Sequence, residues 1–185
     1  WAKIKDFVCE ESEEKLIAED RLVEVDGLLQ NDEKGQSIIV NDIKEFIIDE
    51  YQIVEAKTWG ADVILLIAAI LSQSEIKTFS ELAKSLDLEV LLEVHNEKEL
   101  QKSLMPTIDM IGVNNRNLKS FTVDLETSKT LSKDIPEDFI KVSESGINSV
   151  EAIKDLQTYG FKGFLIGEQF MKTQDPGKTA MQFIK

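Results

Sequence analysis

The sequence has a single cysteine, Cys9, among its 185 residues. One cysteine can form neither an internal disulfide nor a cysteine metal cluster, so we expect a reducing, cytoplasmic environment. Long hydrophobic runs are also lacking, because the longest apolar run covers only nine positions, 63–71. A membrane helix needs about 18 such residues, and the first residues lack the apolar stretch of a signal peptide. We therefore expect a soluble protein with no membrane partner.

Positive charge is scarce, since 21 lysines and arginines face 35 aspartates and glutamates, which leaves a net charge of −14. Such a field repels nucleic acid and anionic lipid surfaces, and we expect neither as a partner. The acidic residues show no spacing typical of metal ligands, so we predict no metal site. An anionic small molecule would need a local cluster of backbone N–H groups or basic side chains.

The first 36 residues differ from the rest of the chain. They carry eleven acidic and five basic residues and no proline. Apolar residues at three-to-four spacing, such as Ile4, Phe7 and Val8, indicate helix, while residues 22–25 alternate as in a short strand and Gly27 is typical of a turn. We predict an acidic, mostly helical segment over residues 1–36, followed by a second region over residues 37–185.

Residues 37–185 alternate short apolar runs with longer amphipathic stretches, which is typical of a parallel sheet covered on both faces. The expected strands cover 37–40, 62–68, 89–94, 109–113, 139–143 and 163–167; the expected helices cover 49–59, 74–86, 97–105, 125–133, 149–159 and a last one from about 177. These are six βα units, whereas a TIM (βα)₈ barrel has eight and about 250 residues. We predict the α/β class and a truncated or incomplete barrel of this family.

Polar residues follow several of these strands, at the edge where parallel barrels bind ligands. The candidates are Lys44, Glu93, Asn114, Arg116, Glu144 and Ser145. An acid within an apolar strand, such as Glu93, needs a polar cavity or a cation, and its pKa rises towards the range useful for proton transfer. The alternatives are a solvent-exposed acid for Glu93 and a solvated lysine for Lys44. His95 has no Ser or Cys partner in sequence, and we expect no catalytic duty for it.

Two consecutive strands end in a glycine-containing turn, at Ser145-Gly146 and at Gly167-Glu168. Turns of this kind present free backbone N–H groups to phosphate, and in barrels the phosphate site follows the last two strands. Either glycine alone could simply relieve a tight turn. The pair together predicts a phosphate-binding site.

The chain resembles the indole-3-glycerol phosphate synthase family of tryptophan biosynthesis over about residues 37–185. The resemblance is carried, in the family order, by residues 44–53, 60–69, 88–95, 111–118, 142–147 and 164–168, which include Leu-Leu-Glu-Val-His at 91–95 and Val-Ser-Glu-Ser-Gly-Ile at 142–147. It implies a carboxy-lyase that converts 1-(2-carboxyphenylamino)-1-deoxyribulose 5-phosphate to indole-3-glycerol phosphate with loss of CO₂ and water. It implies no organic cofactor and no metal.

The resemblance also implies a role for each matching residue. Lys44 matches the general acid and Glu93 the general base, while Asn114 and Glu144 match the residues that support the reacting centre. Arg116 and Ser145 match substrate contacts, and Phe46 and Leu65 match apolar walls against the aromatic ring. The phosphate cradle is matched by Ser145, Gly146, Gly167 and Glu168.

The chain departs from the family in its first strands. The family's Glu-x-Lys-x-x-Ser-Pro pattern is absent from residues 1–43, and the polar pair Asn41-Asp42 stands where the family's third strand is normally apolar. A second hypothesis is therefore a truncated or rebuilt barrel that binds phosphate with little or no turnover. Six strands leave open sheet edges, which we expect the N-terminal segment or self-association to cover.

Overall fold

The computed structural model describes residues 24–31, 37–44, 46–175 and 177–180, and for residues 24–31 and 37–44 it describes the backbone only. Seven strands form one sheet in sequence order. They are β1 (Glu24–Asn31), β2 (Ser37–Lys44), β3 (Val63–Ile67), β4 (Glu89–Val94), β5 (Met110–Asn114), β6 (Ile140–Glu144) and β7 (Phe161–Leu165). β1 is antiparallel to β2, and all later pairs are parallel.

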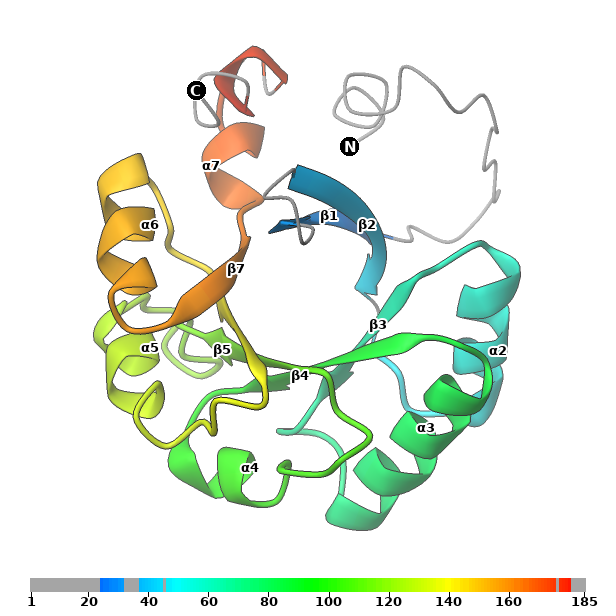
Figure 1. The fold of residues 1–185 in the computed structure, drawn as a ribbon. Helices are drawn as coiled ribbons and strands as arrows, with labels where there is room; N and C mark the ends of the chain where they lie inside the picture. Colours follow the sequence, from blue (N-terminus) through cyan, green and yellow to red (C-terminus); the bar gives the residue numbers. More distant parts are fainter. Residues whose placement is uncertain (1–23, 32–36, 45, 176, 181–185) are drawn as a thin grey trace.

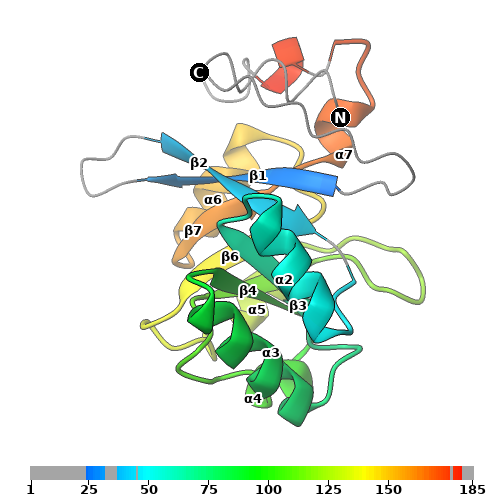
Figure 2. The same ribbon diagram turned by 90° about the vertical axis from the view of Figure 1, so that its right-hand side faces the viewer.

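The strands curl into a ring with helices on its outside (Figure 1). The helices are α2 (Glu50–Thr58), α3 (Gln73–Ser85), α4 (Glu97–Gln101), α5 (Glu126–Leu131), α6 (Val150–Gln157) and α7 (Glu168–Met171). β1 approaches β7, although no pairing joins these two strands among the described residues. The β1–β2 hairpin thus lies across the gap between β3 and β7 (Figures 1 and 2).

Alternation along each strand divides the apolar residues between two cores. The outward set, which includes Ile64, Leu92 and Val113, packs against the helices. The inward set fills the ring with Val63, Leu65, Ile67, Leu91, Met110, Val142 and Leu165. Because the same alternation continues to the ends of the strands, it also decides which polar side chains face inward there.

The helices begin and end where the sequence provides caps. Asp49 and Ser72 each form a capping box at the start of α2 and α3, and Ser149 caps α6. Gly60 and Gly160, which follow α2 and α6, have φ values of 82° and 88°, which suit glycine at a helix end.

The predicted class and barrel family are confirmed, and each of the six predicted strands overlaps one of β2 to β7. Some details were wrong. Gly27 lies inside β1 rather than in a turn, β1 extends beyond the short strand expected at 22–25, and β2 continues through Asn41 and Asp42 to Lys44. Cross-strand pairing of the hairpin explains these differences, because it accommodates polar residues that break an apolar pattern. The helices predicted over residues 1–23 lie outside the described residues.

None of the helices in the described part of the chain is long and apolar enough to cross a membrane.

Candidate active site at the mouth of the barrel

Three buried polar side chains lie on adjacent strands at the carboxyl end of the sheet. Glu93 of β4 is only 3% exposed, and its Oε1 accepts a hydrogen bond of 3.1 Å from Nδ2 of Asn114 on β5. Asn114 pairs in register with Glu144, the fully buried last residue of β6. The alternative in which Glu93 is a solvent-exposed acid is therefore wrong. The geometry brings together three of the four predicted catalytic residues.

Gly112 makes room for this group. It lies two residues before Asn114 on β5, and a Cβ placed on it would come within 2.0 Å of Oε1 of Glu144. The missing side chain lets the Glu144 carboxylate lie against the β5 backbone, and a larger residue would force this carboxylate to move.

His95 extends the group outward from Glu93. Its Nε2 lies 3.1 Å from Oε1 of Glu93, and its Nδ1 lies 3.1 Å from Oε2 of Glu99 on α4. Burial alone would lower the pKa of His95, but the two glutamates more than offset this effect and raise it to about 9. His95 is thus an imidazolium at neutral pH. The sequence analysis expects no catalytic role for His95 and does not identify Glu99 as its partner. The Glu93-x-His95 spacing alone does not show that the following helix places a second acid beside the ring.

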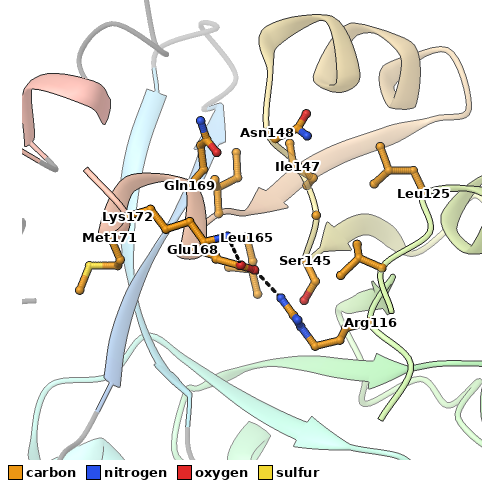
Figure 3. Close-up of a pocket in the computed structure, with 14 residues that line it drawn as sticks. Arg116, Leu125, Ser145, Ile147, Asn148, Leu165, Glu168, Gln169, Met171 and Lys172 are labelled. Atoms are coloured by element: carbon orange, nitrogen blue, oxygen red, sulfur yellow. Dashed lines mark hydrogen bonds and ion pairs between the residues drawn. The ribbon is translucent and has the colours of Figure 1, made fainter. Parts of the chain in front are cut away.

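A cavity of about 830 Å³ opens beside these residues (Figure 3). The loops after β5, β6 and β7 line it, and all five of the predicted phosphate and substrate contacts in these loops take part: Arg116, Ser145, Gly146, Gly167 and Glu168. Ser145 and Gly146 have φ values of 66° and 77°, an αL pair that turns the chain sharply after β6. A Cβ on Gly167 would meet no atom within 4 Å, so this residue borders open space.

Arg116 crosses the cavity to Glu168. Its Nη2 pairs with Oε2 of Glu168, while Nζ of Lys172 pairs with the other carboxylate oxygen (Figure 3). The hydrogen bond from Lys172 and, as a smaller effect, that from Arg116 hold the pKa of Glu168 below its usual range. Two cations with one carboxylate between them can attract an anion here despite the acidic character of the whole chain.

A buried network holds the loop after β6, and the sequence did not indicate it. Nδ2 of Asn115 donates to Oγ of Ser143 and to the carbonyls of Glu144 and Ser145, at 3.0 to 3.1 Å. Its Oδ1 accepts from the backbone N–H and the hydroxyl of Ser128 on α5. The repeated amide in Asn114-Asn115 was the available signal, because neighbouring strand residues face opposite sides of the sheet.

Three predicted residues lie elsewhere. Lys44 is the last residue of β2, two positions after Asp42, which pairs with the inward-facing Val63. Phe46 is 69% exposed in the following loop, and Leu65 is completely buried in the inner core. The structure does not bring Phe46 or Leu65 to the cavity.

Within the described part of the chain, no group of three or more His, Cys, Asp or Glu side chains could hold a metal ion.

Comparison with known families and proteins gives a consistent result. The family model described as indole-3-glycerol phosphate synthase matches residues 5–183. Proteins named indole-3-glycerol phosphate synthase are similar: that of Bacteroides thetaiotaomicron is 54% identical over 142 residues, that of Caldanaerobacter subterraneus 51% over 142 and that of Campylobacter jejuni 46% over 135. These matches cover 77%, 77% and 73% of this chain. They cover 54%, 54% and 52% of the relatives, so the chain spans about half their length.

Solved structures show similarity of the fold alone. KGPDC from Streptococcus mutans superposes with a TM-score of 0.59 at 19% identity, covering 80% of this chain and 71% of its own. A mandelate oxidase with benzoyl-formic acid gives 0.59 at 14% identity, covering 75% and 53%. These neighbours are TIM-barrel proteins.

Proposed function

The chain belongs to the indole-3-glycerol phosphate synthase family, and from this premise we propose that it carries that family's carboxy-lyase chemistry. The substrate is 1-(2-carboxyphenylamino)-1-deoxyribulose 5-phosphate. Ring closure, loss of CO₂ and loss of water convert it to indole-3-glycerol phosphate. The protein acts in tryptophan biosynthesis in the cytoplasm, with a phosphorylated small molecule as its partner.

One observation carries this proposal: a buried acid group directly adjoins a cavity with anion-binding features. Glu93 and Asn114 are joined by a hydrogen bond, and the backbone N–H of Arg116 donates to Oδ1 of Asn114 at 2.9 Å. Arg116 in turn lines the cavity. A substrate with a phosphate at one end and a reacting ring at the other fits such an arrangement, because each end meets a different kind of group.

In this mechanism Lys44 is the general acid that activates the substrate carbonyl for ring closure. Glu93 is the general base of the dehydration, and Asn114 and Glu144 orient and support the reacting centre. A positioned proton-transfer group contributes on the order of 10²- to 10⁴-fold to the rate. The parallel pairing of β2 with β3 supports the role of Lys44, since this last residue of β2 lies at the carboxyl end of the sheet.

In the proposed phosphate cradle, backbone N–H groups at Ser145 and Gly146 and at Gly167 and Glu168 bind the phosphate, and Arg116 contacts the substrate. The cavity that these residues line supports the assignment. Phe46 and Leu65 remain candidate walls for the aromatic ring. Contact with the ring requires Phe46 to turn inward from its exposed position and a ligand to reach down to the buried Leu65.

The test is steady-state formation of indole-3-glycerol phosphate by the purified chain. We expect weak activity, because the Glu and Lys of the family's first strand are absent and misplacement by about 1 Å can cost on the order of 10²-fold. Lys44→Ala and Glu93→Gln should each abolish the residual activity. Matched controls are Lys98→Ala and Glu97→Gln, which change the same residue types on α4, outside the catalytic group, and should have no effect.

The second hypothesis, a barrel that binds phosphate without turnover, rests on the same cavity. It predicts a response of the amides at Ser145, Gly146, Gly167 and Glu168 to inorganic phosphate in NMR spectra, with no product formed. Unchanged turnover in both Lys44→Ala and Glu93→Gln would contradict the proposed mechanism. An intact fold whose amides at these turns do not respond to phosphate would contradict the cradle.

A further inference from the structure

Three titratable side chains form a continuous chain from the mouth of the barrel to α4. The Glu93 carboxylate, the His95 ring and the Glu99 carboxylate follow one another at 3.1 Å, and the backbone N–H of His95 also donates to Oε2 of Glu99 at 2.8 Å. The side chains of all three residues are largely buried. Both ring nitrogens of His95 therefore lie 3.1 Å from a carboxylate oxygen.

Local structure fixes the outer end of this chain. Asn96 is the N-cap of α4, and its side chain accepts from the backbone N–H of Glu99 at 3.1 Å and donates to Oε1 of Glu99 at 2.6 Å. The other carboxylate oxygen, Oε2, binds His95. Both oxygens of the Glu99 carboxylate are therefore held in place. A single stretch of seven residues, 93–99, thus provides an acid, a cation and a second acid in fixed positions.

The charges in this chain are complementary. A buried carboxylate needs a cation or several hydrogen bonds to remain ionised. On the neighbouring strand β5, the neutral amide of Asn114 donates a hydrogen bond to Glu93 but brings no charge. The His95 ring, with Nε2 at 3.1 Å from Oε1, can bring a positive charge to the Glu93 carboxylate.

We propose that His95, held by Glu99, is a positioning residue that keeps the Glu93 carboxylate ionised and fixed in orientation for proton transfer. The inference rests on the proposed function, in which Glu93 is the general base. Both carboxylates favour the imidazolium, which agrees with a pKa of His95 near 9. Glu99 holds the ring at Nδ1, and Nε2 lies 3.1 Å from Oε1 of Glu93, an ion-pair contact without hydrogen-bond geometry.

The first experiment uses the fact that His95 is the sole histidine of the chain. Its ring proton signals in a ¹H NMR titration need no assignment. We expect a midpoint near pH 9 in the wild type, and a midpoint at least about one unit lower in Glu99→Gln and in Glu93→Gln, because each variant removes one carboxylate while burial remains. Glu97→Gln, on the same helix turn, is the matched control and should not move the midpoint. A wild-type midpoint near 6.5, or one that ignores both variants, would overturn the proposal.

A second measurement reads Glu93 itself. The ¹³C carboxyl signal that disappears in Glu93→Gln should titrate at least about one pH unit higher in His95→Gln than in the wild type, because the neutral amide no longer stabilises the anion. An unchanged midpoint would overturn the proposal. Neither titration requires turnover, so a failure of the proposed function and a failure of this inference are distinguishable.

The kinetic counterpart is the pH profile. In His95→Gln we expect the acid limb of kcat to move up by about one unit, so that kcat at pH values below the limb falls about tenfold, with KM little changed. Glu99→Asp, which keeps the charge, should recover part of the activity lost in Glu99→Gln. A His95→Gln variant that is less stable but keeps the wild-type acid limb would show a merely structural role.

Discussion

At the scale of the residue, the missing side chain of Gly112 determines where the Glu144 carboxylate can lie. Its position on β5 is occupied from the other side by the Glu144 carboxylate, which approaches to a distance that no Cβ would allow. Glu93, Asn114 and Glu144 could be predicted from the sequence because polar residues at the ends of apolar strands are conspicuous. Gly112 could not, because a glycine within a strand pattern does not show which side chain uses the space.

We therefore expect Gly112→Ala to lower the free energy of unfolding by about 1–3 kcal/mol, because the added methyl group forces the buried Glu144 side chain to move. Gly167→Ala is the matched control. Its φ is not in the left-handed region and no atom lies within 4 Å of the added carbon, so it should change stability by less than about 0.5 kcal/mol. Urea unfolding of the three proteins checks this, and equal stability of both variants would contradict it.

The raised pKa of His95 also links stability to pH. Its folded value of about 9 lies above its ordinary value of 6.5, so the stabilisation is fully present below pH 6.5 and is lost as pH rises to about 9. The loss should reach up to about 3 kcal/mol. Urea unfolding at pH 6.5 and pH 9.5 should show this loss in the wild type but not in His95→Gln. The same pH dependence in both proteins would refute the linkage.

At the scale of the element, the ends of β5 and β6 depend on a side chain that belongs to neither the cavity nor the core. Asn115 joins the end of β5 to β6 and to α5 through five hydrogen bonds. The loop that starts at Ser145 is thus anchored on its carbonyl side. In the proposed cradle, its backbone N–H groups bind the phosphate.

Loss of this anchor should destabilise the whole barrel mouth. We expect Asn115→Ala to cost about 2–4 kcal/mol, since it leaves buried hydroxyl and carbonyl groups unsatisfied. Asn117→Ala, which removes an exposed amide from the loop after β5, is the control and should lower the free energy of unfolding by less than about 1 kcal/mol. Thermal unfolding compares the two, and similar losses would show that the network does not contribute as proposed.

The parallel elements were predictable and the hairpin was not. Buried parallel strands read as nearly continuous apolar runs, as in Val63–Ile67, and capping residues such as Ser72 mark the helices. β1 and β2 include Gly27, Asn41 and Asp42, which break such runs. A strand whose stability comes from its antiparallel partner carries a weaker pattern in its own sequence.

At the scale of the whole molecule, an acidic protein is proposed to bind an anion. The net charge of −14 opposes phosphate at long range, whereas Arg116 and Lys172 attract it locally. The Glu168 carboxylate forms ion pairs with both cations (Figure 3). A phosphate that enters must compete with this carboxylate.

Glu168→Gln should therefore bind inorganic phosphate about 5- to 10-fold more tightly, which corresponds to about 1 kcal/mol for one fewer competing charge at a partly exposed site. Glu81→Gln on α3 removes the same charge far from the cavity and should change the affinity less than twofold. Titration by NMR measures both. Equal gains in the two variants would mean that only the net charge matters.

The reversed direction of β1 also determines where reporter groups can be attached. Glu24 begins β1 opposite Lys44, at the mouth, whereas Asn31 ends it opposite Ser37, at the far rim. In a Cys9→Ser background, a dye on a cysteine introduced at position 24 would therefore lie at the ligand-binding end. The same dye at position 31, only seven residues further along the chain, would lie at the opposite end and serve as its internal reference.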